Sequence, residues 1–280
     1  MKISRRRLLI ATTTMVVCRN NVSASRAQAD DFQSQLDKLA SDEDLLSATR
    51  EYRERQSDEF DFYASRAVAP RRPPSDRRIS PSAERLIVTF EVSSPQVYEK
   101  KYRTAVWPHG LSGVTIGVGY DLGYVTAEWF VEDWSEHLSP TELSTLKPAC
   151  EVTGPKAQQI LASIGSVVIP WEKAHDQFKK FVLQRYVAET IASLPNANRL
   201  SDDSLGALVS LVYNRGPSFK KQTDRYIEMR AIHLHMARRE YSKIPGEIRS
   251  MKRIWDGDPK MRGLLVRRDL EADLFEKGLV

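Results

Sequence analysis

The chain has 280 residues, 41% of them hydrophobic, which is enough apolar material for one sizeable folded domain with additional segments. Its 42 basic and 37 acidic residues give a net charge of +5, but six basic residues and no acidic residue precede Asp30. The remaining 36 basic residues balance the acidic ones. The charge therefore does not indicate nucleic-acid binding, and we expect no nucleic-acid partner.

Residues 1–29 are predicted to be an export signal. The stretch SRRRLLIATTTMVVC has a basic start and a short apolar run, and the AQA at 27–29 offers a small-x-small cleavage site. The apolar run is too short to span a bilayer and no second one follows, so we expect no stable membrane span and a periplasmic or secreted protein. A twin-arginine signal, a lipoprotein attached at Cys18 and a disordered basic tail are alternatives.

Residues 30–79 are predicted to be an acidic helical segment followed by a linker. Leu36, Leu39, Leu45 and Leu46 follow a loose helical pattern. The stretch AVAPRRPPSDRRIS then combines prolines and arginines, a composition that cannot bury enough apolar surface to offset its ordering entropy. We expect a solvated tether, with contact to an anionic polymer or membrane surface as the alternative.

The main domain is predicted to cover residues 80–280 and to begin with a helix. Ser80 is a suitable N-cap, Pro81 a suitable first residue, and an apolar stripe follows until Pro95 ends the helix. Glu91 then lies in the last turn, where the helix dipole disfavours an anion. A carboxyl group in that position is a candidate for proton-transfer chemistry.

The stretch SGVTIGVGYDLG at 112–123 has two possible interpretations. Gly117 and Gly119 match two glycines of the dinucleotide-binding pattern G-x-G-x-x-G, but Leu122 occupies the third glycine position. We therefore favour a small hairpin or sheet within residues 106–123, which would present Thr115 and Asp121.

From about residue 126 onward the pattern is helical. The predicted fold class is therefore α+β and mainly α, with a small β element after the first helix. Cys150 is the single cysteine left after signal cleavage, so no intramolecular disulfide can form, and a buried inert thiol is favoured over a catalytic one.

Four stretches in the same order resemble the phage-type lysozyme superfamily, and within it most closely the pesticin-like muramidases. They are TFE, TIGVGYDLG, ALVSLVYNRGPSF and GLLVRRDLEADLF, and the likeness extends over residues 80–280. The resemblance implies a lysozyme-like fold with a small N-terminal β-hairpin and a helical C-terminal lobe. It also implies cleavage of the β-1,4 bond between N-acetylmuramic acid and N-acetylglucosamine, with peptidoglycan glycan strands as the partner.

The resemblance implies that Glu91, Thr115 and Asp121 are the catalytic residues. Glycoside hydrolysis needs a protonated carboxylic acid and a second group that positions water or stabilises the developing positive charge. Glu91 suits the acid, Asp121 the ionised partner, and Thr115 can hold a water. Asp121 as a turn cap, Thr115 as an ordinary strand residue and Glu99 as a rival second carboxylate are alternatives.

This sequence departs from the phage lysozymes in two respects. It has no aspartate between Glu91 and Thr115, and Tyr120 stands where they commonly carry histidine. Both departures favour the pesticin-like arrangement. They also leave the role of the second carboxylate open.

Four further residues are predicted to contact the sugar, because sugar faces stack on aromatic rings and hydroxyls pair with amides: Tyr120, Trp107, Tyr124 and Asn214. The resemblance implies a structural ion-pair network of Arg267, Arg268 and Glu271 far from the chemistry. We expect no cofactor and no metal, since His233 and His235 have no third ligand at metal spacing. We expect a monomer.

Two other functions are compatible with the sequence. A lytic transglycosylase would use Glu91 without needing Asp121. A non-catalytic glycan-binding or scaffold module would use neither.

Overall fold

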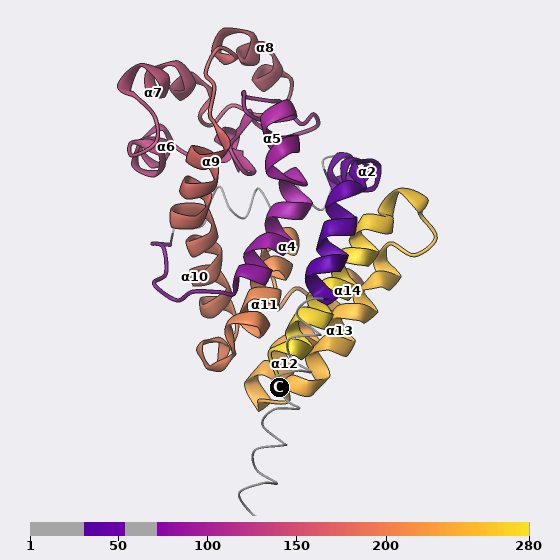
Figure 1. Ribbon diagram of the computed structural model, residues 1–280. Helices are drawn as coiled ribbons and strands as arrows, with labels where there is room; N and C mark the ends of the chain where they lie inside the picture. The colour runs from indigo at the N-terminus through magenta and orange to yellow at the C-terminus, as the bar shows by residue number, and fades with distance from the viewer. Residues whose placement is uncertain (1–30, 54–71, 280) are drawn as a thin grey trace, which may run out of the picture.

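The computed structural model describes residues 31–53 and 72–279, and Figure 1 shows their arrangement. The predicted export signal and the first part of the predicted linker lie outside the described residues. The described chain is mainly helical with one two-stranded antiparallel sheet, which confirms the α+β, mainly α class. No helix in the described ranges has the length and apolar character that crossing a membrane requires.

The helix that carries Glu91 begins and ends close to the predicted positions. In α4 (Pro81–Val92), the Ser80 side chain accepts a hydrogen bond from the Ala83 N–H, and a proline occupies the first turn. The chain then turns at Ser93 and enters α5 (Pro95–Lys101), whose N-cap is Ser94. Glu91 therefore lies in the last turn of α4, as predicted.

The glycine-rich stretch forms a hairpin. Strands β1 (Thr115–Ile116) and β2 (Tyr120–Asp121) pair with Thr115 opposite Asp121 and Ile116 opposite Tyr120. Gly117 and Gly119 in the turn have φ values of 57° and 70°, which glycine adopts at no steric cost. A short 3₁₀ turn, η1 (Leu122–Tyr124), follows in place of the helix that a dinucleotide-binding loop requires.

Helices make up the rest of the molecule (Figure 1). The upper part in that view holds α6 (Ala127–Trp134), α7 (Pro140–Leu146) and α8 (Pro155–Ile164). A continuous helical column leads away from it through α9 (Trp171–Gln177), the π-helical segment Phe178–Val182 and α10 (Leu183–Ser193). The lower part contains α11 (Asp202–Arg215), α12 (Ile227–Arg238), α13 (Ile244–Ser250) and α14 (Arg262–Lys277).

The N-terminal helices share the hydrophobic core of the residues that follow them. A helix at 31–41 and α2 (Glu43–Arg53) contribute the buried side chains of Phe32, Leu36, Leu39 and Leu46. In Figure 1, α2 lies beside α4 and α14, with which it makes contacts. Residues 31–53 and the predicted main domain therefore pack as one hydrophobic unit.

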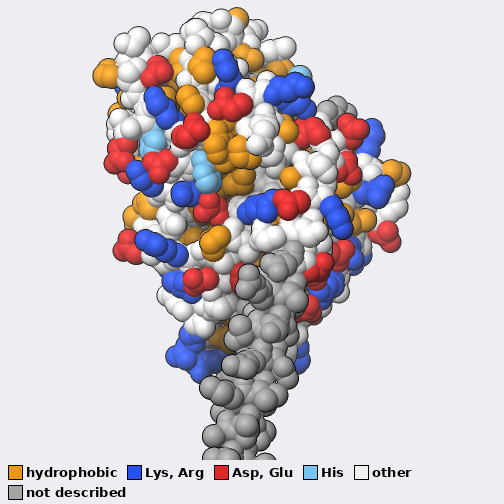
Figure 2. Space-filling model, viewed as in Figure 1, with side chains coloured by type: hydrophobic (Ala, Val, Ile, Leu, Met, Phe, Trp, Pro, Cys, Tyr) orange, Lys and Arg blue, Asp and Glu red, His pale blue; other side chains and the backbone are white. Residues whose placement is uncertain are grey.

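The described part of the predicted linker, residues 72–79, is largely exposed but attached to the helices. Arg72 pairs with Glu189 of α10 at 3.0 Å, and Arg77 pairs with Asp202 at the start of α11 at 2.5 Å. On the face shown in Figure 2, basic and acidic side chains are interspersed over most of the surface. That distribution agrees with the near-neutral composition of the chain after residue 29.

Candidate active site

Helix α4, the hairpin and helix α14 meet at the carboxyl group of Glu91. The residue is only 8% exposed. Its Oε1 lies 3.6 Å from Nη1 of Arg267 in α14. Its Oε2 lies on the side of Gly119, since a Cβ added to that glycine would be 3.3 Å from Oε2. One oxygen therefore faces a buried guanidinium and the other faces the hairpin turn.

Gly119 places no side chain of its own beside this carboxyl group. The glycine is itself exposed, and an added Cβ would also lie 2.9 Å from the hydroxyl of Tyr213 in α11. Any larger residue would press on both polar groups. The tight fit and the positive φ therefore explain why a glycine occupies this position next to Glu91 and Tyr213.

Thr115 and Asp121 project from the same face of the hairpin. Directly opposed residues of an antiparallel pair share a face, and both of these are half-buried, whereas their neighbours Ile116 and Tyr120 point into the core. Within the described part of the chain, the Thr115 hydroxyl has no hydrogen-bond partner. It is therefore available to bind a water or a ligand.

The Asp121 carboxylate caps the turn that follows it. Its Oδ1 accepts a hydrogen bond from the Gly123 N–H at 2.8 Å, and its Oδ2 accepts one from the Gly113 N–H at 3.2 Å. Glu91 meets the hairpin at Gly119, in the turn directly before Tyr120 of β2. The hairpin therefore carries Thr115, Asp121 and the Gly119 contact with Glu91, and two backbone N–H groups hold the Asp121 carboxylate.

Trp107 and Tyr124 lie beside the hairpin. Trp107 is half-buried, donates from Nε1 to the Ser112 carbonyl at 3.0 Å, and packs its ring against His109 with 4.8 Å between centroids. The Tyr124 hydroxyl donates to the carbonyl of Leu111, a residue that is 50% exposed. Both aromatic residues anchor the loop 107–112 through their polar ends, next to the segment that pairs with Thr115.

Of the other two predicted binding residues, Tyr120 is buried and Asn214 is half-buried. Tyr120 is buried and donates from its hydroxyl to Asp133 at 2.8 Å, with its ring edge against Trp134. The Asn214 side-chain oxygen accepts a hydrogen bond from Arg268 at 2.9 Å. The structure does not present the Tyr120 ring to solvent, and it ties Asn214 to a buried arginine.

Glu99, the rival second carboxylate, has a structural contact of its own. Its Oε1 accepts a hydrogen bond from the Trp171 N–H at 2.6 Å, at the start of α9. Cys150 is also unsuited to nucleophilic chemistry, because burial and the nearby charge of Glu151 raise the pKa of its thiol to about 11.

Arg267 belongs to the site, although the resemblance placed its ion-pair network far from the chemistry. Arg267 and Arg268 each pair with Oε1 of Glu271, at 3.1 and 3.0 Å, as predicted. The same network reaches Glu91 through Arg267, whose guanidinium also lies over the Phe90 ring. The sequence spacing indicates the pairs within α14 but carries no signal that α14 packs on α4.

This cluster of Glu91, Arg267, Arg268 and Glu271 places two guanidinium groups beside two carboxyl groups in the interior. Buried charges are tolerated when they are paired in this way. Burial lowers the pKa of Arg268 to about 9, against the opposing effect of Glu271 and with the help of Arg267 and Arg215. The cluster therefore joins α4 to α14 at the residue most suited to acid–base chemistry.

Comparison with models of known protein families finds no match, and comparison with curated proteins finds no related sequence. Among the described residues, no group of three or more His, Cys, Asp or Glu side chains could hold a metal ion.

Proposed function

We propose that this protein is a peptidoglycan hydrolase of the muramidase type with a lysozyme-like fold. It would cleave the β-1,4 bond between N-acetylmuramic acid and N-acetylglucosamine. The observation that carries the proposal is the Glu91 carboxyl group, which is buried at a helix end with one oxygen toward Arg267 and the other toward an exposed glycine. The order of elements, with a helix ending in glutamate, a hairpin and then a helical lobe, fits the resemblance drawn from the sequence.

In the proposed mechanism Glu91 is the general acid. It gives a proton to the leaving glycosidic oxygen from the side of the exposed Gly119. The carboxylate that remains is negative, and the Arg267 guanidinium 3.6 Å from Oε1 stabilises that charge in an environment of low dielectric. Arg267 thus assists the proton transfer without touching the substrate.

The hairpin supplies the second half of the proposed mechanism. The Thr115 hydroxyl, which has no hydrogen-bond partner among the described residues, can hold the attacking water. Asp121, fixed by two backbone N–H groups, places negative charge on the same face, where it stabilises the oxocarbenium-like state or helps to orient that water. Trp107 and Tyr124 would contact the glycan beside the hairpin.

One observation favours a second candidate, a lytic transglycosylase. Both oxygens of Asp121 accept backbone hydrogen bonds, so Glu91 is the carboxyl group better placed for chemistry. In an enzyme that needs one carboxyl group, the C6 hydroxyl of the muramic acid would attack its own C1 in place of water. The product would carry a 1,6-anhydro end.

Mass analysis of fragments released from purified peptidoglycan tests the proposal. We expect disaccharide products with reducing N-acetylmuramic acid ends. Products that end in 1,6-anhydro-muramic acid would show that the protein is a lytic transglycosylase and not a hydrolase. Binding to the cell wall without any released fragment would leave only a glycan-binding module.

We further propose that the protein acts in the periplasm or outside the cell. The basic and apolar leader at 1–29 supports this location. Fractionation of cells that produce the full chain tests it, since a cytoplasmic product that retains residues 1–29 would contradict export.

A further inference from the structure

The chain leaves α4 through a strained turn only two residues after Glu91. Ser93 has φ 63° and ψ −64°, and the Ser94 N–H donates to the Val92 carbonyl across it at 2.8 Å. This is a γ-turn with positive φ at its centre, which is rare and costly for a residue other than glycine. Such a conformation persists only where the surrounding contacts enforce it.

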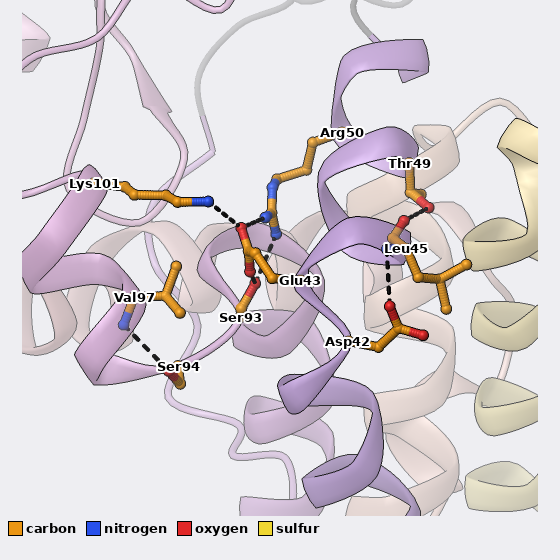
Figure 3. A network of polar contacts seen from close by, with 9 residues as sticks. All are labelled: Asp42, Glu43, Leu45, Thr49, Arg50, Ser93, Ser94, Val97 and Lys101. Atoms are coloured by element: carbon orange, nitrogen blue, oxygen red, sulfur yellow. Dashed lines mark hydrogen bonds and ion pairs between the residues drawn. The ribbon is translucent and has the colours of Figure 1, made fainter.

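The contacts that enforce this turn come from α2. The buried Ser93 hydroxyl donates to Oε2 of Glu43 and accepts a hydrogen bond from Nη1 of Arg50 at 3.1 Å. Arg50 also pairs with Oε1 of Glu43 at 2.6 Å, and Lys101 at the end of α5 pairs with the same oxygen at 3.0 Å. Figure 3 shows these side chains converging between α2, the turn and α5.

The network places the Glu43 carboxylate between two cations, Arg50 and Lys101. Burial opposes ionisation of Glu43, but the hydrogen bonds from Ser93 and Lys101 and the charge of Arg50 outweigh it and lower the pKa of Glu43. The carboxylate is therefore ionised at neutral pH, and two cations flank it. Charge-assisted hydrogen bonds of this kind are stronger and more directional than neutral ones.

A second contact of α2 reaches the other element that holds Glu91. Gly263, near the start of α14, packs so closely on Thr49 that an added Cβ would lie 1.8 Å from the Thr49 hydroxyl. The same helix α14 carries Arg267. Helix α2 thus touches both elements whose side chains meet at the Glu91 carboxyl group.

We propose that Glu43 and Arg50 of the N-terminal helix α2 are positioning residues for Glu91, because they clamp the strained Ser93 turn that ends its helix. The part of this inference that concerns catalysis rests on the proposed function; the part that concerns the structure of the turn does not. Neither residue touches the substrate. Their effect is to hold the orientation of the last turn of α4, where a displacement of about 1 Å can cost about 100-fold in rate.

The test compares Glu43→Ala, Glu43→Gln and Ser93→Ala with the matched control Asp37→Asn. Asp37 also ties the N-terminal helices to α4, through Arg85, but Arg85 lies six residues or about 9 Å before Glu91 along the helix. Each variant of the full chain is assayed on soluble peptidoglycan chains for kcat and KM, and by hydrogen exchange at the Ser93 and Ser94 amides.

We expect Glu43→Ala and Ser93→Ala to lower kcat by about 10- to 100-fold with KM within about twofold. Their Ser93 and Ser94 amides should exchange at least about tenfold faster. We expect a smaller loss in Glu43→Gln, which keeps a hydrogen-bond acceptor and provides the measurement if Glu43→Ala fails to fold. Asp37→Asn should match the wild type in both readouts.

Unchanged kcat in Glu43→Ala and Ser93→Ala, or an equal loss in Asp37→Asn, would overturn the inference. A wild-type protein without any glycan cleavage would overturn the proposed function and the catalytic half of the inference together. The exchange measurement would still decide whether Glu43 clamps the turn, because unchanged exchange at Ser93 and Ser94 refutes the clamp whatever the activity.

Discussion

At the scale of single residues, the two oxygens of Glu91 have opposite surroundings. Oε1 faces the positive charge of Arg267, and Oε2 faces a glycine that bears no side chain. Such an arrangement separates the group that stabilises the carboxylate from the direction in which a proton would leave. The glycine is therefore as important to the proposed chemistry as the charged residues.

Replacing Gly119 by alanine should impair both activity and stability. The new Cβ would lie 2.9 Å from the Tyr213 hydroxyl and 3.3 Å from Glu91, and the φ of 70° is unfavourable for alanine. We expect Gly119→Ala to lose about 1 kcal/mol of unfolding free energy and at least about tenfold in kcat. Chemical denaturation and a glycan-release assay measure the two effects.

Gly246→Ala is the matched control for Gly119→Ala. Nothing lies within 4 Å of an added Cβ at Gly246, which is in α13. Alanine there should be neutral or stabilise by up to about 1 kcal/mol, because it has the higher helix propensity. Equal activity in Gly119→Ala and Gly246→Ala would argue that the space beside Glu91 has no role.

At the scale of elements, the close approach of α2 to α14 joins residues 31–53 to the rest of the fold. The contact depends on a glycine at position 263, because the Thr49 hydroxyl occupies the space that a side chain would need. Phe32, Leu36 and Leu46 are also buried and belong to the common hydrophobic core. The N-terminal helices are therefore expected to contribute to the stability of the whole molecule.

Gly263→Ala should destabilise the protein by about 1–3 kcal/mol, the usual cost of overpacking a tight contact. Thr49→Ala removes the hydroxyl nearest to the new Cβ, so the double variant should recover part of that loss. A double-mutant cycle on unfolding free energies measures the coupling. Additive effects would show that α2 and α14 do not pack as described.

The local signals in the sequence were sufficient for α4 and for the hairpin. Ser80, Pro81 and the apolar stripe are short-range signals, and the predicted helix and the last-turn position of Glu91 agree with the structure. The alternation of strand residues could also have placed Tyr120. If Thr115 and Asp121 point outward, their neighbours point inward, and Tyr120 is in fact buried against Asp133.

At the scale of the whole molecule, the contacts that complete the candidate site join residues far apart in the sequence. Arg267 contacts Glu91, and Glu43 contacts Ser93, between helices that are distant in the sequence. The hydrophobic periodicity of a helix does not show which other helix it packs against. The acidic composition that begins at residue 30 indicated a separate segment, yet Phe32, Leu36, Leu39 and Leu46 of its described part enter the common core. An acidic overall composition reflects the exposed face of a helix. A few apolar residues at helical spacing are enough for the opposite face to pack against the core.

The most direct test of the central claim is cleavage and binding of purified peptidoglycan by Glu91→Gln, with Glu84→Gln as the control. Glu84 lies on the same helix, seven residues before Glu91, and pairs with His175 at 2.8 Å. We expect Glu91→Gln to bind the wall like the wild type and to lose at least about 100-fold in cleavage rate, while Glu84→Gln stays active. Undiminished cleavage by Glu91→Gln would contradict the role of Glu91 as the acid.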